Sequence, residues 1–280
     1  MHRRDFLTGV AAAAGLGLLP ARACAASAFA PSRFSVLVQG TGPDVILIPG
    51  LTASRAVWQA VVAGTPGYRY HLVQLSGFAG DPPRGNARGQ VAAASAAELA
   101  RYIAANRLRR PALVGHSMGG TIALMVAARQ PALAGKVMVV DMLPQPSALF
   151  GSTAEGVRGL ADSLGGLAAA PGGRELVASL IGMFGDGSAA SARSDPDVVA
   201  RAAHELAVTD LRGELARIRA PLTVVYASLD PRRRMSLDRL YADAYRAKPG
   251  AKLVRVDNSG HMIMADQPKR FRALFADFLR

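Results

Sequence analysis

The chain is poor in cysteine, lysine and aromatic residues. Cys24 is the only cysteine among 280 residues, so no disulfide can form within the chain, and no Cys/His group has zinc-site spacing. Aromatic residues make up 6%, and the formal net charge of +13 comes almost wholly from arginine. Because these arginines are scattered and few aromatic residues accompany them, we do not expect a nucleic-acid partner.

The overall composition is that of a folded protein. Half of the residues are hydrophobic and 19% are charged, which excludes a disordered tail. The chain has no internal repeat, so a solenoid is not expected. Its length suits one large α/β domain or two small ones.

Residues 1–28 have the character of an export signal. Arg3-Arg4 followed by Phe6-Leu7 resembles the twin-arginine motif of bacterial proteins that are exported folded. The apolar stretch from Phe6 to Leu19 is shorter than the ~20 residues of a membrane-spanning helix. Small residues around Cys24 and Ser27 fit signal-peptidase cleavage. We expect a periplasmic mature domain over residues 29–280, with an uncleaved anchor helix as the alternative.

Short apolar runs and helical patterns alternate along the chain. Helical spacing predicts helices over Val91–Asn106, Met118–Arg129 and Lys269–Leu279. Strand–helix alternation of this kind indicates an α/β fold with a mostly parallel central sheet flanked by helices. The predicted strands are Phe34–Val38, Val45–Ile48, His71–Leu75, Ala112–Val114, Val137–Val140, Leu222–Tyr226 and Leu253–Val256.

The stretch from about residue 145 to 215 interrupts this alternation. It contains no strong strand pattern but several short helical patterns, among them Glu155–Leu167, Arg174–Phe184 and Val198–Val208. We interpret it as a helical cap inserted over the reactive edge of the sheet. A set of ordinary surface helices is the alternative.

The strongest chemical signal is Gly115-His116-Ser117-Met118-Gly119, which fits G-x-S-x-G between a predicted strand and a predicted helix. A nucleophile on so tight a turn has a strained backbone, and glycines two residues before and after it avoid steric clashes. The turn presents the Ser117 hydroxyl and leaves the Met118 N–H at a helix N-terminus. We therefore predict that Ser117 is a nucleophile.

Serine needs a neighbouring base, and the base needs a carboxylate. His261 follows the strand Leu253–Val256, at the carboxyl edge where catalytic loops gather. Asp230 follows the strand Leu222–Tyr226, which gives the order Ser117, Asp230, His261. We predict that these three side chains form a triad. Asp141, at the end of the strand Val137–Val140, is the main alternative acid, and Asp257 is a lesser one.

A tetrahedral oxyanion needs two hydrogen-bond donors. Gly50 lets the backbone turn closely after the strand Val45–Ile48, so the Leu51 N–H can face the oxyanion beside the Met118 N–H. We predict that these two N–H groups form the oxyanion hole. An ordinary strand-exit turn is the alternative for Leu51.

These motifs together resemble the α/β-hydrolase superfamily, in particular its small capped, esterase-like members. The resemblance spans roughly residues 33–280 and includes Pro49-Gly50-Leu51 with Trp58, the glycine-containing loop at 75–80, the Ser117 motif, and Gly260-His261. Many members have His-Gly where this chain has Pro49-Gly50, a departure that bears on pocket polarity rather than on the triad.

The resemblance implies a serine hydrolase of the carboxylesterase type that acts on a small, hydrophobic substrate without a cofactor or metal. The same triad also serves C–C bond hydrolases and lactonases, and these remain alternatives. From other classes, a non-catalytic ligand receptor and a charged envelope-surface binding module also remain. The predicted pocket residues are Met142, Leu143, Leu180, Met183 and Phe184.

Overall fold

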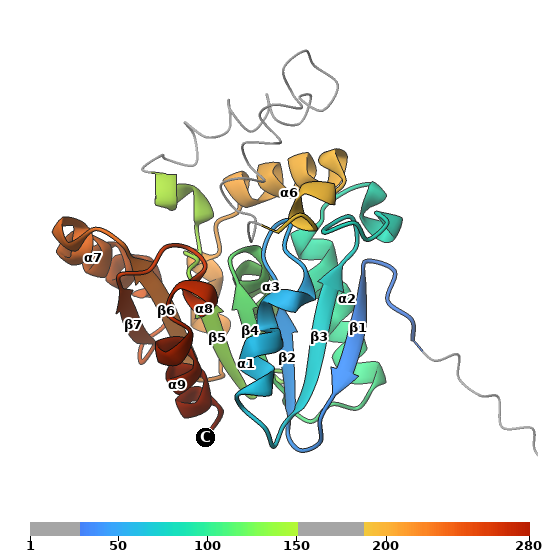
Figure 1. Ribbon diagram of the computed structural model, residues 1–280, viewed down its shortest axis with the longest axis horizontal. Coiled ribbons are helices and arrows are strands. Elements are labelled where there is room, and N and C mark those ends of the chain that lie inside the picture. Colours follow the sequence, from blue (N-terminus) through green and yellow to red (C-terminus); the bar gives the residue numbers. More distant parts are fainter. Residues whose placement is uncertain (1–28, 151–187) are drawn as a thin grey trace, which may run out of the picture.

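The computed structural model describes residues 29–150 and 188–280, which form a seven-stranded sheet with helices on both sides (Figure 1). The strand order is β1-β3-β2-β4-β5-β6-β7, with β1 antiparallel to β3 and all other neighbours parallel. The predicted fold class is confirmed. The strands are β1 Phe34–Gln39, β2 Asp44–Ile48, β3 Arg69–Leu75, β4 Ala112–His116, β5 Lys136–Val140, β6 Leu222–Ser228 and β7 Lys252–Asp257.

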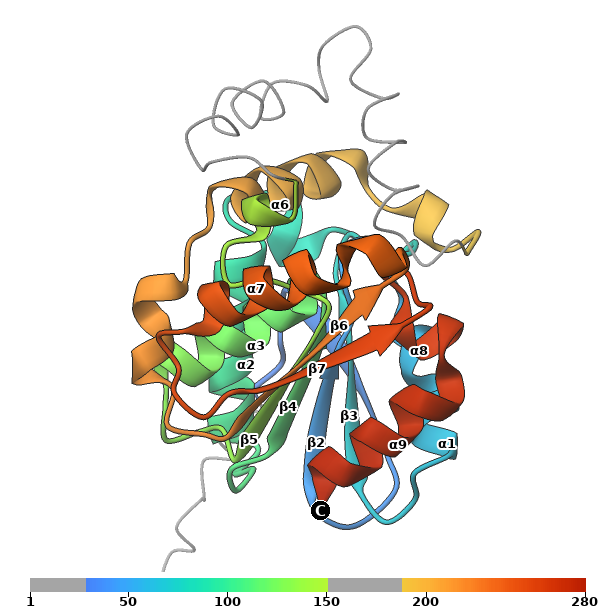
Figure 2. The same ribbon diagram turned by 90° about the vertical axis from the view of Figure 1, so that its left-hand side faces the viewer.

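Alternate side chains of the sheet enter two hydrophobic layers, as the period of a strand requires. In β2, Ile46 and Ile48 pack with the helices α2 and α3, whereas Val45 and Leu47 pack with α1 and α9. Figure 2 shows the two groups of helices on opposite sides of the sheet. The helices are α1 Gln59–Ala63, α2 Ala92–Ala105, α3 Met118–Arg129, α6 Pro196–Val208, α7 Arg234–Tyr245, α8 Ile263–Asp266 and α9 Pro268–Leu279.

The described residues between β5 and β6 include the helix α6 and short 3₁₀ helices. Asp195 caps α6, since its carboxylate accepts the N–H groups of Asp197 and Val198 at 3.0 and 2.9 Å. The Asp195 N–H donates to Gly77 O after β3 (2.7 Å), and α6 crosses the carboxyl edge of the sheet (Figure 1). The helix α6 agrees with the predicted Val198–Val208, whereas residues 151–187 lie outside the described ranges.

A buried carboxylate fastens α6 to the body. Glu205 accepts the N–H groups of Val91, Ala92 and Ala93 at 2.6, 2.8 and 2.8 Å. These donors lie at the start of α2, where a helix has N–H groups without partners inside the helix and a partial positive charge. Glu205 thus stabilises α2 and fixes α6 above the sheet.

The predicted export signal at residues 1–28 also lies outside the described ranges. Among the helices that the structure describes, none has the length and apolar character needed to cross a bilayer.

Candidate active site

Ser117 sits on the turn between β4 and α3 with a backbone conformation that only a few residue types adopt. Its φ is 51° and its ψ is −124°. A Cβ on Gly115 would lie 2.0 Å from Gly119 O, and a Cβ on Gly119 would lie 2.2 Å from Ile48 O. The turn therefore requires both glycines, and its strain costs on the order of 1–3 kcal/mol, which the surrounding packing offsets.

The Ser117 hydroxyl is buried and has no hydrogen-bond partner within residues 29–150 and 188–280. Two buried interactions hold the backbone around it: Ser117 N–H donates to Val140 O at 2.9 Å, and Gly120 N–H donates to Ser117 O at 2.7 Å. The hydroxyl is thus presented on a fixed backbone, which is the arrangement a nucleophile needs.

His261 lies beside this turn. The ring of His116 is 4.6 Å from the His261 ring, centroid to centroid, and His116 Nε2 is 3.0 Å from the His261 carbonyl oxygen. A carbonyl only accepts, so His116 Nε2 carries the proton in this bond. Burial, with the nearby His261 ring, lowers the pKa of His116 to about 3, so His116 stays neutral and fixes the His261 backbone.

The carboxylate that meets His261 is Asp141, not Asp230. Asp141 Oδ2 lies 2.8 Å from His261 Nδ1. Asp141 follows β5 with a φ of 51°, and its N–H donates to Val225 O at 2.7 Å. Its other oxygen, Oδ1, accepts the Ala227 N–H at 2.8 Å and the Tyr241 hydroxyl at 3.3 Å. The predicted pairing of Asp230 with His261 is therefore corrected to the pairing with Asp141.

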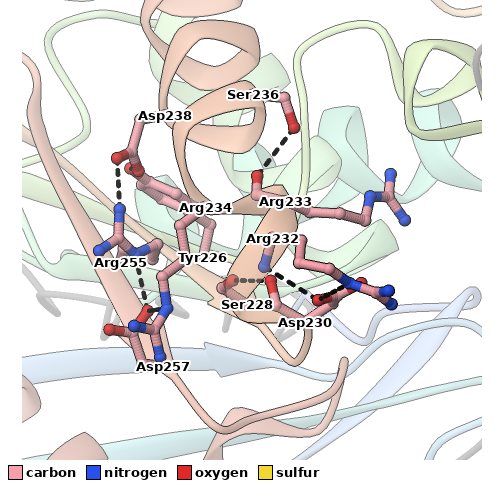
Figure 3. Close-up of polar contacts among 10 residues, drawn as sticks. All are labelled: Tyr226, Ser228, Asp230, Arg232, Arg233, Arg234, Ser236, Asp238, Arg255 and Asp257. Atoms are coloured by element: carbon pink, nitrogen blue, oxygen red, sulfur yellow. Dashed lines mark hydrogen bonds and ion pairs between the residues drawn. The ribbon is translucent and has the colours of Figure 1, made fainter.

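Asp230 has local partners instead. Its carboxylate accepts the Arg232 backbone N–H at 2.9 Å and forms a forked ion pair with the Arg232 guanidinium (Figure 3). These bonds lower the pKa of Asp230 and cap the short helix at 231–233. Asp257, the lesser alternative, pairs with Arg255 and Arg234 at 2.7 and 3.2 Å.

The two predicted oxyanion residues also lie beside Ser117. A Cβ on Gly50 would lie 3.0 Å from Ser117 Cβ, so the loop that carries Leu51 touches the turn. Met118 is the first residue of α3, where the N–H has no partner inside the helix. Both residues are buried, with exposed fractions of 1% and 0%. Both backbone segments therefore lie next to Ser117.

The loop after β2 is held by residues that the sequence did not single out. Thr52 has a φ of 61°, which is rare for a β-branched residue. Ser191 donates its hydroxyl to Thr52 Oγ1 at 2.8 Å, and Ser194 Oγ lies 3.4 Å from Thr52 O. The segment that leads into α6 thereby stabilises the loop beside Ser117.

Two of the five predicted pocket residues lie in the described part of the chain. Met142 and Leu143 are 2% and 0% exposed and belong to the hydrophobic core beside α3. Leu180, Met183 and Phe184 lie outside the described residues. Within the described residues, no group of three or more His, Cys, Asp or Glu side chains could hold a metal ion.

Comparison with known proteins gives the family. The profile of the Alpha/beta hydrolase family matches residues 45–274, which is most of the chain. The chain belongs to this family. Its seven-stranded sheet, the serine turn and the histidine at the carboxyl edge are consistent with that membership.

The curated relatives are esterases that match over part of their length. Pimeloyl-[acyl-carrier protein] methyl ester esterase of Vibrio vulnificus is 32% identical over 108 residues, 38% of this chain and 40% of that protein. The same esterase of Aeromonas hydrophila is 33% identical over 106 residues, again 38% of this chain and 40% of that protein. The matches thus span about two-fifths of these relatives.

Solved structures share the fold across nearly the whole chain. A thermophilic esterase from Thermogutta terrifontis has a TM-score of 0.67 and 20% identity, covering 88% of this chain and 93% of that one. The enol-lactonase from Burkholderia xenovorans has a TM-score of 0.64 and 21% identity, covering 88% and 96%. At such identities the likeness establishes the fold.

Proposed function

We propose that the protein is a serine hydrolase of the carboxylesterase type, with Ser117 as nucleophile, His261 as base and Asp141 as the acid. The observation that carries the proposal is the 2.8 Å contact between Asp141 Oδ2 and His261 Nδ1 beside the strained turn of Ser117. Hydrolysis by a serine nucleophile needs this combination of a serine hydroxyl, an imidazole base and an orienting carboxylate.

In the first half of the reaction, His261 Nε2 takes the Ser117 proton while Ser117 Oγ bonds to the carbonyl carbon of the ester. Asp141 accepts the Nδ1–H of His261 and stabilises the imidazolium that forms. The N–H groups of Leu51 and Met118 bind the oxyanion, and one such donor contributes about 3 kcal/mol. The carbon–oxygen bond to the alcohol then breaks, and His261 gives its proton to the leaving alcohol.

In the second half, water attacks the acyl group on Ser117. His261 takes a proton from the water, the tetrahedral intermediate collapses, and the proton returns to Ser117 as the acid leaves. His116 stays neutral throughout because of its lowered pKa, so it does not compete with His261 for protons. No step of this cycle calls for a metal or an organic cofactor.

The relatives guide the choice of substrate. The curated relatives are named for a methyl ester, and one structural neighbour is named an enol-lactonase. We propose an ester with a small, hydrophobic acyl or alcohol group as the substrate, and a lactone as the second candidate. Both are opened by the same attack of Ser117 on a carbonyl carbon.

A fluorophosphonate probe tests the nucleophile. The mature chain should be labelled, and Ser117→Ala should abolish labelling while keeping the same thermal melt. Absence of labelling in folded wild-type protein would contradict the proposal and favour a non-catalytic receptor. Turnover of p-nitrophenyl esters of rising chain length, beside lactones and vinylogous diketones, then separates an esterase from a lactonase or a C–C bond hydrolase.

We further propose that residues 1–28 direct export to the periplasm through the twin-arginine route. The support is the pair Arg3-Arg4 with the short apolar stretch after it. Changing both arginines to lysine should leave the protein in the cytoplasm of a bacterial host. Unchanged export of that variant would point to a different route.

A further inference from the structure

The carboxylate of Asp141 is held on the side opposite to His261. Its Oδ2 meets His261 Nδ1, while its Oδ1 accepts the Ala227 N–H at 2.8 Å and the Tyr241 hydroxyl at 3.3 Å. Rotation of an aspartate carboxyl about its last bond is soft, so hydrogen bonds must set its plane. Tyr241 thus donates a side-chain hydrogen bond to the same carboxylate that meets His261.

Tyr241 is itself fixed in place. It is 1% exposed and stacks on Tyr226, with ring centroids 4.1 Å apart and an interplanar angle of 14°. The Tyr226 hydroxyl donates to Asp238 at 2.6 Å, and Asp238 pairs with Arg255 (Figure 3). The ion pairs at the surface thereby hold Tyr226, and Tyr226 holds the ring that carries the hydroxyl to Asp141.

We propose that Tyr241 is a positioning residue that orients Asp141 and sets the proton affinity of His261. The inference rests on the proposed function, because it assigns Asp141 and His261 to the hydrolytic site. Tyr241 touches neither substrate nor Ser117 in this mechanism, and it acts through Asp141.

The Tyr241 hydroxyl is the donor in its hydrogen bond to the Asp141 carboxylate. Burial first, and the neighbouring charge of Asp141 second, raise the pKa of Tyr241 well above its ordinary value, so the proton stays on the oxygen. A donated O–H withdraws negative charge from a carboxylate, which weakens its attraction for an imidazolium. Removing the hydroxyl should therefore strengthen the electrostatic attraction between Asp141 and a protonated His261. It should also let the carboxylate rotate more freely.

Three groups near the pair, His116, Tyr226 and Tyr245, keep one protonation state near neutral pH. His116 of β4 is neutral because its pKa is lowered to about 3. Tyr226 of β6 and Tyr245 of α7 stay protonated, because burial raises the pKa of each. Asp266 accepts the Gly260 N–H at 2.8 Å, on the backbone next to His261.

The chain offers a matched control in the same helix. Tyr245 is also buried and stacked on Tyr241, but its hydroxyl donates to the Met142 carbonyl at 2.7 Å and not to Asp141. Tyr241→Phe and Tyr245→Phe each remove one buried hydroxyl and keep the ring. A merely structural role would make the two variants alike in every readout.

Two measurements compare the variants. NMR follows the ring signals of His261, assigned with His261→Gln, as the pH is changed, and steady-state kinetics on a p-nitrophenyl ester follow kcat and KM. We expect Tyr241→Phe to move the His261 titration midpoint up by about half a pH unit and to lower kcat about tenfold with little change in KM. Tyr245→Phe should leave the midpoint and kcat within about twofold of the wild type.

A Tyr241→Phe variant that matches Tyr245→Phe in both the midpoint and kcat would overturn the inference. The NMR measurement needs no substrate, so it tests this inference independently of the proposed function. A failure of the proposed function would appear instead as absent fluorophosphonate labelling of the wild type. If Tyr241→Phe does not fold, wild-type protein labelled with ¹³Cζ-tyrosine gives the same test. The Tyr241 signal should respond when His261 titrates, and a silent Tyr241 signal would refute the hydrogen bond.

Discussion

Replacing Asp141 by asparagine should abolish most of the activity, and the structure gives the reason. Asp141 Oδ1 faces two donors, the Ala227 N–H and the Tyr241 hydroxyl, at 2.8 and 3.3 Å. In Asp141→Asn these donors require the amide oxygen at the Oδ1 position. The amide NH₂ then occupies the Oδ2 position, 2.8 Å from His261 Nδ1 in the wild type.

An amide NH₂ at that place can only donate, so His261 Nδ1 must become the acceptor and Nε2 must carry the proton. A protonated Nε2 cannot take the proton of Ser117. In a serine protease, the same aspartate-to-asparagine change produces the wrong tautomer and lowers kcat about 10⁴-fold. We expect a loss in kcat of about 10³- to 10⁴-fold here. That loss corresponds to about 4 to 5.5 kcal/mol of transition-state stabilisation, at 1.36 kcal/mol for each tenfold change.

Asp230→Asn is the matched control, since it makes the same chemical change at the position that chain order favours. Asp230 pairs with Arg232, whose side chain is 90% exposed. Losing the negative charge of Asp230 should therefore change kcat less than about twofold. The assay is hydrolysis of p-nitrophenyl butyrate near pH 7.5, with thermal melts to show that both variants fold. The assignment is refuted if Asp230→Asn loses more than a hundredfold while Asp141→Asn keeps more than half of the activity.

Three further changes test the surroundings of the site. Ser191→Ala removes the donor to Thr52 at 2.8 Å and should lower kcat about fivefold with little change in melting temperature, as steady-state kinetics and thermal melts will show. In Glu205→Gln, the side-chain NH₂ faces one of the backbone N–H groups at the start of α2, which then lacks an acceptor. Urea titration should therefore show that the free energy of unfolding is lower by about 2 kcal/mol. The pKa of His116 is about 3 in the folded protein and has an ordinary value of 6.5. At pH values between these two, His116 is protonated in the unfolded chain but neutral in the folded one. The free energy of unfolding should therefore fall by about 1.4 kcal/mol per pH unit as the pH drops from 6 to 4, and the slope should be shallower in His116→Gln.

The central strands could be predicted because they are covered on both faces. Their sequences are short, continuous apolar runs such as Val137–Val140, and the structure extends each predicted strand by at most a few residues. The helix α3 starts and ends where its spacing predicts, because Ser117 and the glycines beside it fix its beginning. The residues around Ser117 could likewise be found, since the turn imposes its own sequence.

The helix α7 was not foreseen, and the reason lies in its composition. It begins at Arg234, the third of three consecutive arginines, and also contains Asp238 and Asp243. Tyr241 and Tyr245 are its only buried residues, so it has a narrow apolar face and a weak helical pattern. The contact of Tyr241 with Asp141 joins residues 100 positions apart, and no local pattern reports such a contact.

The position of the acid depends on a competition between local and distant partners. The strands β5 and β6 are parallel neighbours, so a carboxylate after either one reaches the same edge of the sheet. Asp230 lies two residues beyond β6, and an aspartate there can accept the N–H two residues ahead, as it does from Arg232 at 2.9 Å. That bond closes a very short loop and costs little entropy, whereas reaching His261 would require the chain to turn back.

Asp141 follows β5 directly, and its positive φ turns the carboxylate between Ala227 and His261. Chain order cannot distinguish these outcomes, because the deciding quantities are one backbone angle and the partner that lies nearest.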